Sequence, residues 1–285
     1  MSPSERIKHI KAIATALSNE EWTLLDLTLK QFGLPWTDQW GGGSKEGYVI
    51  EMISSAKDEP LLELAKHLGV ASQLETTIEP KFWSSGSPRV FLSHLASMKA
   101  DILKLREELA KFGISAFVAH VDIEPTKEWQ VEIESALATM DGLIALLAPG
   151  FKESNWCDQE VGVAIGRSLP IVSVRLGLDP YGFIGKYQAV QGVGKDRRIL
   201  ASELYDILML SPTIGPKITS AQVKLLSESP SFDESRRIIH LIEQSAYLTT
   251  KHVASMEESI EKNGQVSSSW GVPEKIHAIA KKIAG

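Results

Sequence analysis

The sequence predicts an α/β protein, in which a flavodoxin-like, doubly wound parallel sheet is flanked by an N-terminal helical bundle and a C-terminal helical segment. In the middle of the chain, continuously apolar segments alternate with amphipathic helical patterns. Both ends show only helical spacing of their apolar residues. Breaks in these patterns predict a helical interaction module at 1–80, a linker at 81–88, the α/β domain at 89–212 and a helical segment at 213–285.

The first 80 residues carry four helical patterns. The apolar residues of the first recur at helical spacing after Ser4, which we expect to cap that helix: Ile7, Ile10, Ile13, Ala14 and Leu17. The other helices are expected over 22–32, 48–55 and 60–68, with Gly33 and Gly69 as stops. Pro35–Gly47 must form a loop, and we expect its two tryptophans, Trp36 and Trp40, to pack onto the bundle; a ligand-stacking face is the alternative.

The linker is predicted from Glu79–Pro88, which combines prolines, serines and a glycine. Beyond it, strands are expected at 89–94, 114–120, 141–149 and 170–176. Helices are expected between and after them, at 99–112, 128–139, 154–167 and 195–210. Because the strands are continuously apolar, the sheet should be parallel and covered on both faces.

The C-terminal segment begins where Ser211–Lys217 interrupts the pattern. A short helix is expected to open at Thr219. Ser231 is expected to cap a long helix that runs from Asp233 to Lys262, and a last helix should cover 273–283. The apolar stripe of the long helix needs a partner surface, either on the α/β domain or on a second copy of the chain.

Composition excludes several classes of function. No apolar run approaches the ~18 residues of a membrane helix, and the first residues are charged, so we expect a cytoplasmic protein without membrane contact. Cys157 is the single cysteine and the seven histidines are scattered, so no metal site is expected. The net charge is −6 and no segment is strongly basic, so no binding to nucleic acid is expected.

In an open α/β sheet, ligands bind at the carboxyl ends of the strands. Polar and aromatic residues that follow the predicted strands are Ser93 and His94, then Asp122, Glu124 and Trp129, then Ser154, Trp156, Cys157 and Glu160. No strand is followed by a GxGxxG or GxxxxGK[ST] loop. Kinase and dehydrogenase chemistry are therefore not expected.

Three segments resemble the TIR domain family and occur in that family's order. RVFLSH (89–94) matches the opening box, VDIEPTKEWQVEIESAL (121–137) resembles the BB loop with its following helix, and SNWCDQE (154–160) matches the S-x-W-C-x-x-E of NAD-consuming members. The resemblance covers about residues 88–210. Two departures are Thr126, where glycine is common, and the first loop HLASMKAD, which is less polar than usual.

Glu160 is the candidate catalytic residue. Cleaving the nicotinamide–ribose bond of NAD needs no acid for the leaving group, because nicotinamide departs neutral. It needs an oxocarbenium-like transition state to be stabilised and the ribose hydroxyls to be held, which one carboxylate can do. Trp156 lies one turn before Glu160, so ring and carboxylate are expected on one helix face. The alternatives are a solvated helix acid for Glu160 and a hydrophobic staple for Trp156.

The predicted substrate-binding residues are Ser93, His94, Asp122, Trp129 and Trp156. Ser93 and His94 are suited to hydrogen-bonding ribose or phosphate, although a serine at a strand end can equally cap the next helix. Trp129 can pin its helix to the sheet instead of touching ligand. Cys157 is interpreted as a packing residue, since the sequence shows no basic partner that would activate it.

The resemblance implies an NAD glycohydrolase or ADP-ribosyl cyclase that is activated by self-assembly through the TIR domain, as in bacterial antiviral effectors. NAD would be the substrate, with no further cofactor, and the helical ends would sense a protein or small-molecule activator. One alternative is a non-enzymatic scaffold that acts through TIR–TIR contacts. Another is a hydrolase similar to nucleoside deoxyribosyltransferases, which would have no use for the BB-loop pattern.

Overall fold

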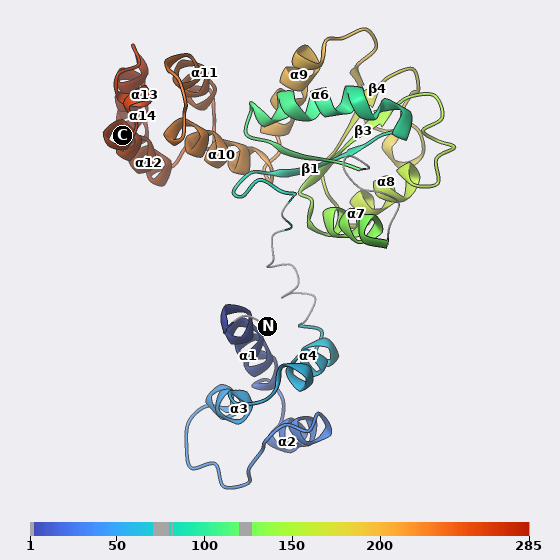
Figure 1. The fold of residues 1–285 in the computed structure, drawn as a ribbon, viewed down its shortest axis with the longest axis vertical. Coiled ribbons are helices and arrows are strands. Elements are labelled where there is room, and N and C mark those ends of the chain that lie inside the picture. The colour runs from blue at the N-terminus through green and yellow to red at the C-terminus, as the bar shows by residue number, and fades with distance from the viewer. Residues whose placement is uncertain (1–2, 71–79, 81, 120–126, 285) are drawn as a thin grey trace. The chain divides into compact units, whose positions relative to one another are not determined.

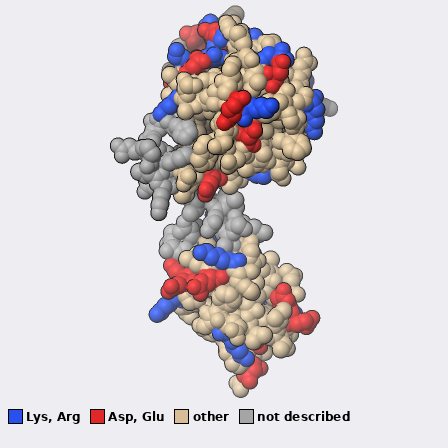
Figure 2. All heavy atoms as spheres, turned by 90° about the vertical axis from the view of Figure 1, so that its right-hand side faces the viewer, with Lys and Arg blue, Asp and Glu red and all other residues tan. Residues whose placement is uncertain are grey.

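The computed structural model describes residues 3–70, 80, 82–119 and 127–284. The chain divides into two compact units, Met1–Glu79 and Pro80–Gly285 (Figure 1). On the face shown in Figure 2, basic and acidic side chains are interspersed over both units. Among the described helices, none is long and apolar enough to cross a membrane.

The N-terminal unit is built from helices α1 (Pro3–Leu17), α2 (Trp22–Gln31), α3 (Lys45–Ile53) and α4 (Asp58–His67). Their buried apolar faces form one core, to which Leu25, Tyr48 and Leu61 contribute. The predicted cap at Ser4 is wrong: α1 already begins at Pro3, whose fixed φ suits a first helical turn, so Ser4 lies inside the helix.

The two loop tryptophans behave differently. Trp40 packs against the core, and its ring meets Tyr48 edge-on with centroids 5.4 Å apart, as expected for a residue that holds the loop on the bundle. Trp36 remains 42% exposed and carries the Lys30 ammonium 3.4 Å from its ring centroid. The core-packing prediction therefore holds for Trp40 and is wrong for Trp36.

The second unit contains a five-stranded sheet of β1 (Arg89–Ser93), β2 (Ser115–Val118), β3 (Gly142–Leu147), β4 (Ile171–Arg175) and β5 (Val190–Gln191). The strand order is β2-β1-β3-β4-β5 and all neighbours are parallel, which confirms the predicted flavodoxin-like fold class. The sequence did not predict β5, because two residues in a glycine-rich loop carry no strand pattern.

Helices cover both faces of this sheet, and a separate apolar core fills each side (Figure 1). The helical elements of the sheet domain are η1 (Ala96–Met98), α6 (Lys99–Ala110), α7 (Lys127–Thr139), α8 (Cys157–Gly166), η2 (Gly182–Ile184) and α9 (Arg197–Met209). Leu92 and Ile144 face α6 and α9, whereas Phe91 and Leu143 face α7 and α8. This alternation along each strand decides which side chains can meet α8.

Part of the predicted linker at 81–88 is packed against the sheet domain. The Trp83 side chain is buried, and its indole N–H donates to Thr139 Oγ1 over 2.8 Å. Its ring also packs with those of Phe82 and Phe117. Burial of Trp83 and partial burial of Phe82 outweigh the turn-forming composition around them, so this stretch belongs to the folded unit.

The C-terminal helices are α10 (Gly215–Ser227), α11 (Phe232–Glu243), α12 (Thr250–Lys262), α13 (Gly264–Ser267) and α14 (Val272–Ala284). Two predictions are wrong. Thr219 lies inside α10, which starts earlier with Pro216 in its first turn. The expected helix from Asp233 to Lys262 is interrupted between α11 and α12, where Thr249 caps α12 by accepting the N–H of His252. The predicted cap at Ser231 is confirmed.

Helix α10 takes part in two cores. Ile218, together with Ile214 just before the helix, belongs to the core between the sheet, α6 and α9. Val223 and Leu226 belong to the core of the C-terminal helices. The amide of Gln222 also donates to the Tyr205 hydroxyl over 3.2 Å. The C-terminal segment therefore packs on the α/β domain through α10, as expected for one of its two possible surfaces. The apolar stripe of α11 and α12, with Ile238, Ile242 and Met256, is instead covered by the C-terminal helices themselves.

Candidate functional site

The strand order reverses between β1 and β3, because β2 follows β1 on one side and β4 follows β3 on the other. At such a switch point the loops after the two strands diverge and leave a crevice at the carboxyl edge of the sheet. Ser93 is the last residue of β1, and the chain leaving β3 enters α8 at Cys157. Two of the predicted site segments thus flank the switch point.

The structure brings Ser93 and Glu160 together. The Ser93 hydroxyl donates to Glu160 Oε2 over 2.5 Å, and the side chains are 0% and 5% exposed. Ser93 lies two residues after Phe91 along β1 and so points to the same face, which α7 and α8 cover. Glu160 lies in the first turn of α8, on that same face. A strand end and a helix start distant in sequence thereby form one buried polar pair.

Burial controls the ionisation of Glu160. Removal from water disfavours the carboxylate and raises the pKa of Glu160 to about 7, while the hydrogen bond from Ser93 acts in the opposite direction. The group therefore changes charge near neutral pH, where an ordinary glutamate is fully ionised. A carboxyl group with such a pKa, held at a sheet switch point, is typical of a functional site.

His94 and Cys157 line the same region. His94 is buried, and its Nδ1–H donates to the Leu92 carbonyl over 2.7 Å. The Cys157 thiol donates to the His94 carbonyl over 3.6 Å. Burial raises the pKa of the Cys157 thiol, which keeps it protonated and unreactive. These contacts agree with the interpretation of Cys157 as a packing residue.

Trp156 has a different environment from Glu160. It occupies the N-cap position of α8 and is 42% exposed, and its carbonyl accepts the Glu160 N–H over 2.9 Å. The ring is thus at the surface, whereas the carboxylate is buried. Asp122 and Glu124 lie outside the described residues. Trp129 belongs to α7, but its side chain is also outside the described part.

Sequence reasoning missed a contact between α8 and the chain that follows β4. The Tyr181 hydroxyl donates to Asp158 in the first turn of α8, and Lys152 lies 5.6 Å from the Tyr181 ring centroid. Burial and the Asp158 carboxylate both raise the pKa of Tyr181. No sequence signal could have identified Tyr181, because it stands in a glycine- and proline-containing loop without periodicity.

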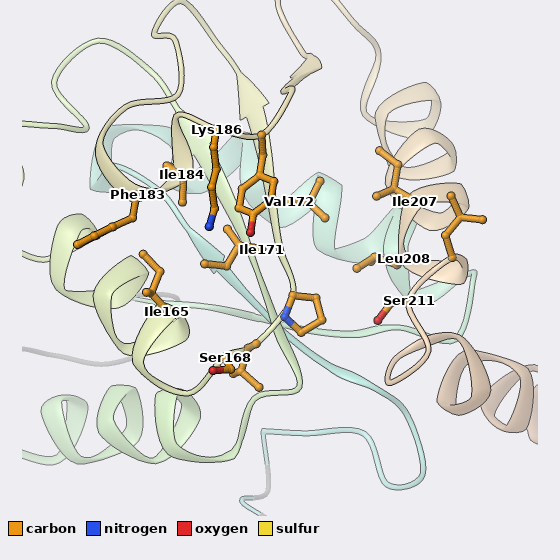
Figure 3. A pocket seen from close by; sticks show the side chains of 14 residues that line it. Ile165, Ser168, Ile171, Val172, Phe183, Ile184, Lys186, Ile207, Leu208 and Ser211 are labelled. Carbon is orange, nitrogen blue, oxygen red and sulfur yellow. The ribbon is translucent and has the colours of Figure 1, made fainter.

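Two cavities lie near this helix but do not include the Ser93–Glu160 pair. One of 270 Å³ lies between α8 and η2 and is bordered by Asp158, Val161 and Tyr181. The other, of 630 Å³, opens beside β4 (Figure 3). Its walls are mostly apolar and include Ile171 and Val172. Within the described residues, no group of His, Cys, Asp or Glu is arranged to hold a metal ion. The candidate site therefore rests on the buried hydrogen-bonded carboxylate and not on cavity size.

Two of the comparisons with known proteins found a match. The family model described as TIR domain matches residues 90–201, a range that contains both Ser93 and Glu160. Among solved structures, the chain is similar to the TIR domain of the Toll-related receptor TRR-2 from Hydra magnipapillata, at 20% identity and a TM-score of 0.35. That match covers 42% of this chain and 97% of the receptor chain. No curated protein gave a significant match.

Proposed function

We propose, from the premise that residues 90–201 form a TIR domain, that the protein cleaves the nicotinamide–ribose bond of NAD as a glycohydrolase or ADP-ribosyl cyclase. Glu160 is the proposed catalytic residue. TIR domains include enzymes and scaffolds, so the proposal depends on what the site contains.

The observation that carries the proposal is the burial of Glu160 against Ser93 at the switch point. The alternative interpretation, a solvated helix acid, requires an exposed side chain, and Glu160 is almost completely buried. Burying an ionisable group costs stability unless it is compensated. Glu160 lies where this fold binds ligands, and its burial costs stability. This combination supports a catalytic role for its carboxylate.

The chemistry fits one carboxylate. As the bond from the nicotinamide nitrogen to C1 of the ribose breaks, the electron pair goes to the nitrogen and neutralises the pyridinium. Positive charge develops on the ribose, and ionised Glu160 would stabilise it and accept hydrogen bonds from the ribose hydroxyls. Water then adds at C1 and loses a proton, giving ADP-ribose. In the cyclase reaction, a nucleophilic atom within the same molecule takes the place of water.

The other predicted residues complete the proposal. His94 and Trp156 lie beside the pair, in the turn after β1 and at the start of α8, and are proposed to contact NAD together with Asp122 and Trp129. The BB loop of a second copy is proposed to complete the site, so that self-assembly activates the enzyme. The helical segments are proposed to receive an activating protein or small molecule, in a cytoplasmic signalling role such as bacterial antiviral defence.

The test is incubation of concentrated protein with NAD, followed by chromatography of the products. Wild type should release nicotinamide, and Glu160→Gln should release none while retaining the fold. Glu153→Gln is the matched control, because Glu153 is an exposed acid just before the same helix and should be dispensable. If concentrated wild type leaves NAD intact, the scaffold alternative replaces this proposal. A Glu160→Gln variant with most of its turnover would show that the site is misassigned.

A further inference from the structure

We infer that Ser93 is a positioning residue, which holds the Glu160 carboxylate in place and in its ionised form instead of contacting the substrate. The inference deepens the proposed function and rests on it. It also changes the role expected for Ser93 from the sequence, which was a hydrogen bond to ribose or phosphate.

Burial separates the two roles. Ser93 is 0% exposed, so no substrate atom can reach its hydroxyl without a rearrangement of the sheet or of α8. A serine hydroxyl has one proton to donate, and in this structure that proton goes to Glu160 Oε2. Among the described residues, Ser93 is the hydrogen-bond partner of the Glu160 side chain, and the contact uses Oε2.

The position of Ser93 in the sheet makes it a fixed donor. It lies in β1, which is paired with β2 on one side and with β3 on the other. Ser93 itself is in register with Ala145 of β3. A donor on a strand inside a sheet moves less than one on a loop, and it therefore holds the carboxylate in one orientation.

The chemical effect follows from the direction of the hydrogen bond. Donation to the charged form of an acid favours ionisation and opposes the effect of burial. Among the described side chains, the charged or titratable ones on α8 and on the elements around it are Arg89 of β1, Glu132 and Glu134 of α7, His94 after β1, Asp158 and Cys157 of α8, Arg175 of β4 and Tyr181 after β4. Within the described part of the chain, Ser93 is the side chain whose contact lowers the pKa of Glu160, and burial is the cause that raises it.

The structure also supplies a matched control. Ser173 of β4 is in register with Ala145 on its other side, so Ser93, Ala145 and Ser173 form one row on the same face of the sheet. Ser173 is also buried, but its hydroxyl has no hydrogen-bond partner among the described residues. Ser173→Ala therefore removes a buried strand hydroxyl without removing a contact to Glu160.

The test compares Ser93→Ala, Ser93→Thr and Ser173→Ala in the full chain with two independent measurements. The first is the pKa of Glu160, taken from the carboxyl ¹³C chemical shift of glutamate-labelled protein against pH, with Glu160→Gln to assign the signal. The second is kcat and KM for NAD across the same pH range. The first measurement requires no catalytic activity, so it separates failure of this inference from failure of the proposed function.

Ser93→Ala should raise the pKa of Glu160 by about one to two pH units, the usual effect of one hydrogen bond to a charged group. With the wild-type pKa near 7, kcat at pH 7 should fall about 5- to 50-fold and recover above pH 9, with KM little changed. Ser93→Thr, which keeps the hydroxyl, and Ser173→Ala should both resemble wild type. An unchanged Glu160 pKa in Ser93→Ala, or a raised KM with an unshifted pH profile, would overturn the inference.

Discussion

Ile218→Ala should destabilise the sheet domain and the C-terminal helices together. Ile218 is fully buried in the core between the sheet, α6 and α9, although it belongs to α10, the first of the C-terminal helices. Truncating a buried isoleucine to alanine typically costs about 2–5 kcal/mol, through lost burial and the cavity left behind. For a unit of this size, a mid-range loss of about 3 kcal/mol lowers the melting temperature by about 6–12 °C.

The assay is calorimetric unfolding of the full chain, with hydrogen exchange to assign each transition to its residues. Ile199→Ala is the matched control, because this isoleucine on α9 is 51% exposed and should change little. Leu226→Ala removes a buried side chain on the other side of α10, in the core of the C-terminal helices. Since one helix contributes to both cores, Ile218→Ala and Leu226→Ala should lower the midpoint temperature of the same unfolding transition.

The result that would refute this reasoning is a separation of the two effects. Ile218→Ala could lower the midpoint temperature of the sheet's unfolding transition while Leu226→Ala lowers that of a different transition. The two cores would then unfold independently, and α10 would not couple them. The N-terminal unit provides an internal reference, because the described residues of its core all precede the sheet domain. Its transition should be unchanged in all three variants.

Three further predictions concern ionisation, truncation and assembly. Because the pKa of Glu160 is about 7 in the folded chain and near 4.5 when unfolded, the folded state holds this proton longer, and stability falls as pH rises from about 4.5 to 7, by at most about 3 kcal/mol. Glu160→Gln should therefore exceed wild type in melting temperature by more at pH 8 than at pH 5; equal differences would contradict this. A chain ending at residue 212 should aggregate in gel filtration, because it lacks Ile214 and Ile218, whereas residues 80–285 should be monodisperse with native circular dichroism. Specific activity toward NAD should rise with protein concentration, and a constant value over a hundred-fold dilution of monomeric protein would exclude activation by assembly.

The sequence predicted the four longer strands because each is continuously apolar, and the structure confirms them. It did not predict how α10 packs. Ile214 stands in a proline- and glycine-containing stretch that indicates a break in the helical pattern. Its burial depends on the sheet, whose first strand, β1, lies more than a hundred residues earlier in the sequence. The break before α12 was hidden for a related reason, since the apolar stripe continues on both sides of the cap at Thr249.

The candidate site shows the same limit. Ser93 and Glu160 were each identified from the sequence, by a position at a strand end and by a motif. Their hydrogen bond could not be predicted, because it depends on the register of β1 and on the rotation of α8 about its axis. The exposure of Trp156 likewise depends on its position at the N-cap, where a ring need not follow the buried face of the helix.

The double role of α10 has a consequence for folding during synthesis. The described core of the N-terminal unit consists of residues up to Val70, so this unit can fold while the rest is being made. The sheet differs from the N-terminal unit in this respect, because all of its strands are synthesised before Ile214 and Ile218, which help to cover it. Until then its α6–α9 face stays partly uncovered, and the nascent chain carries an apolar surface that chaperones bind. Slowing translation just before residue 214 should therefore lengthen this exposed stage and reduce the yield of soluble protein.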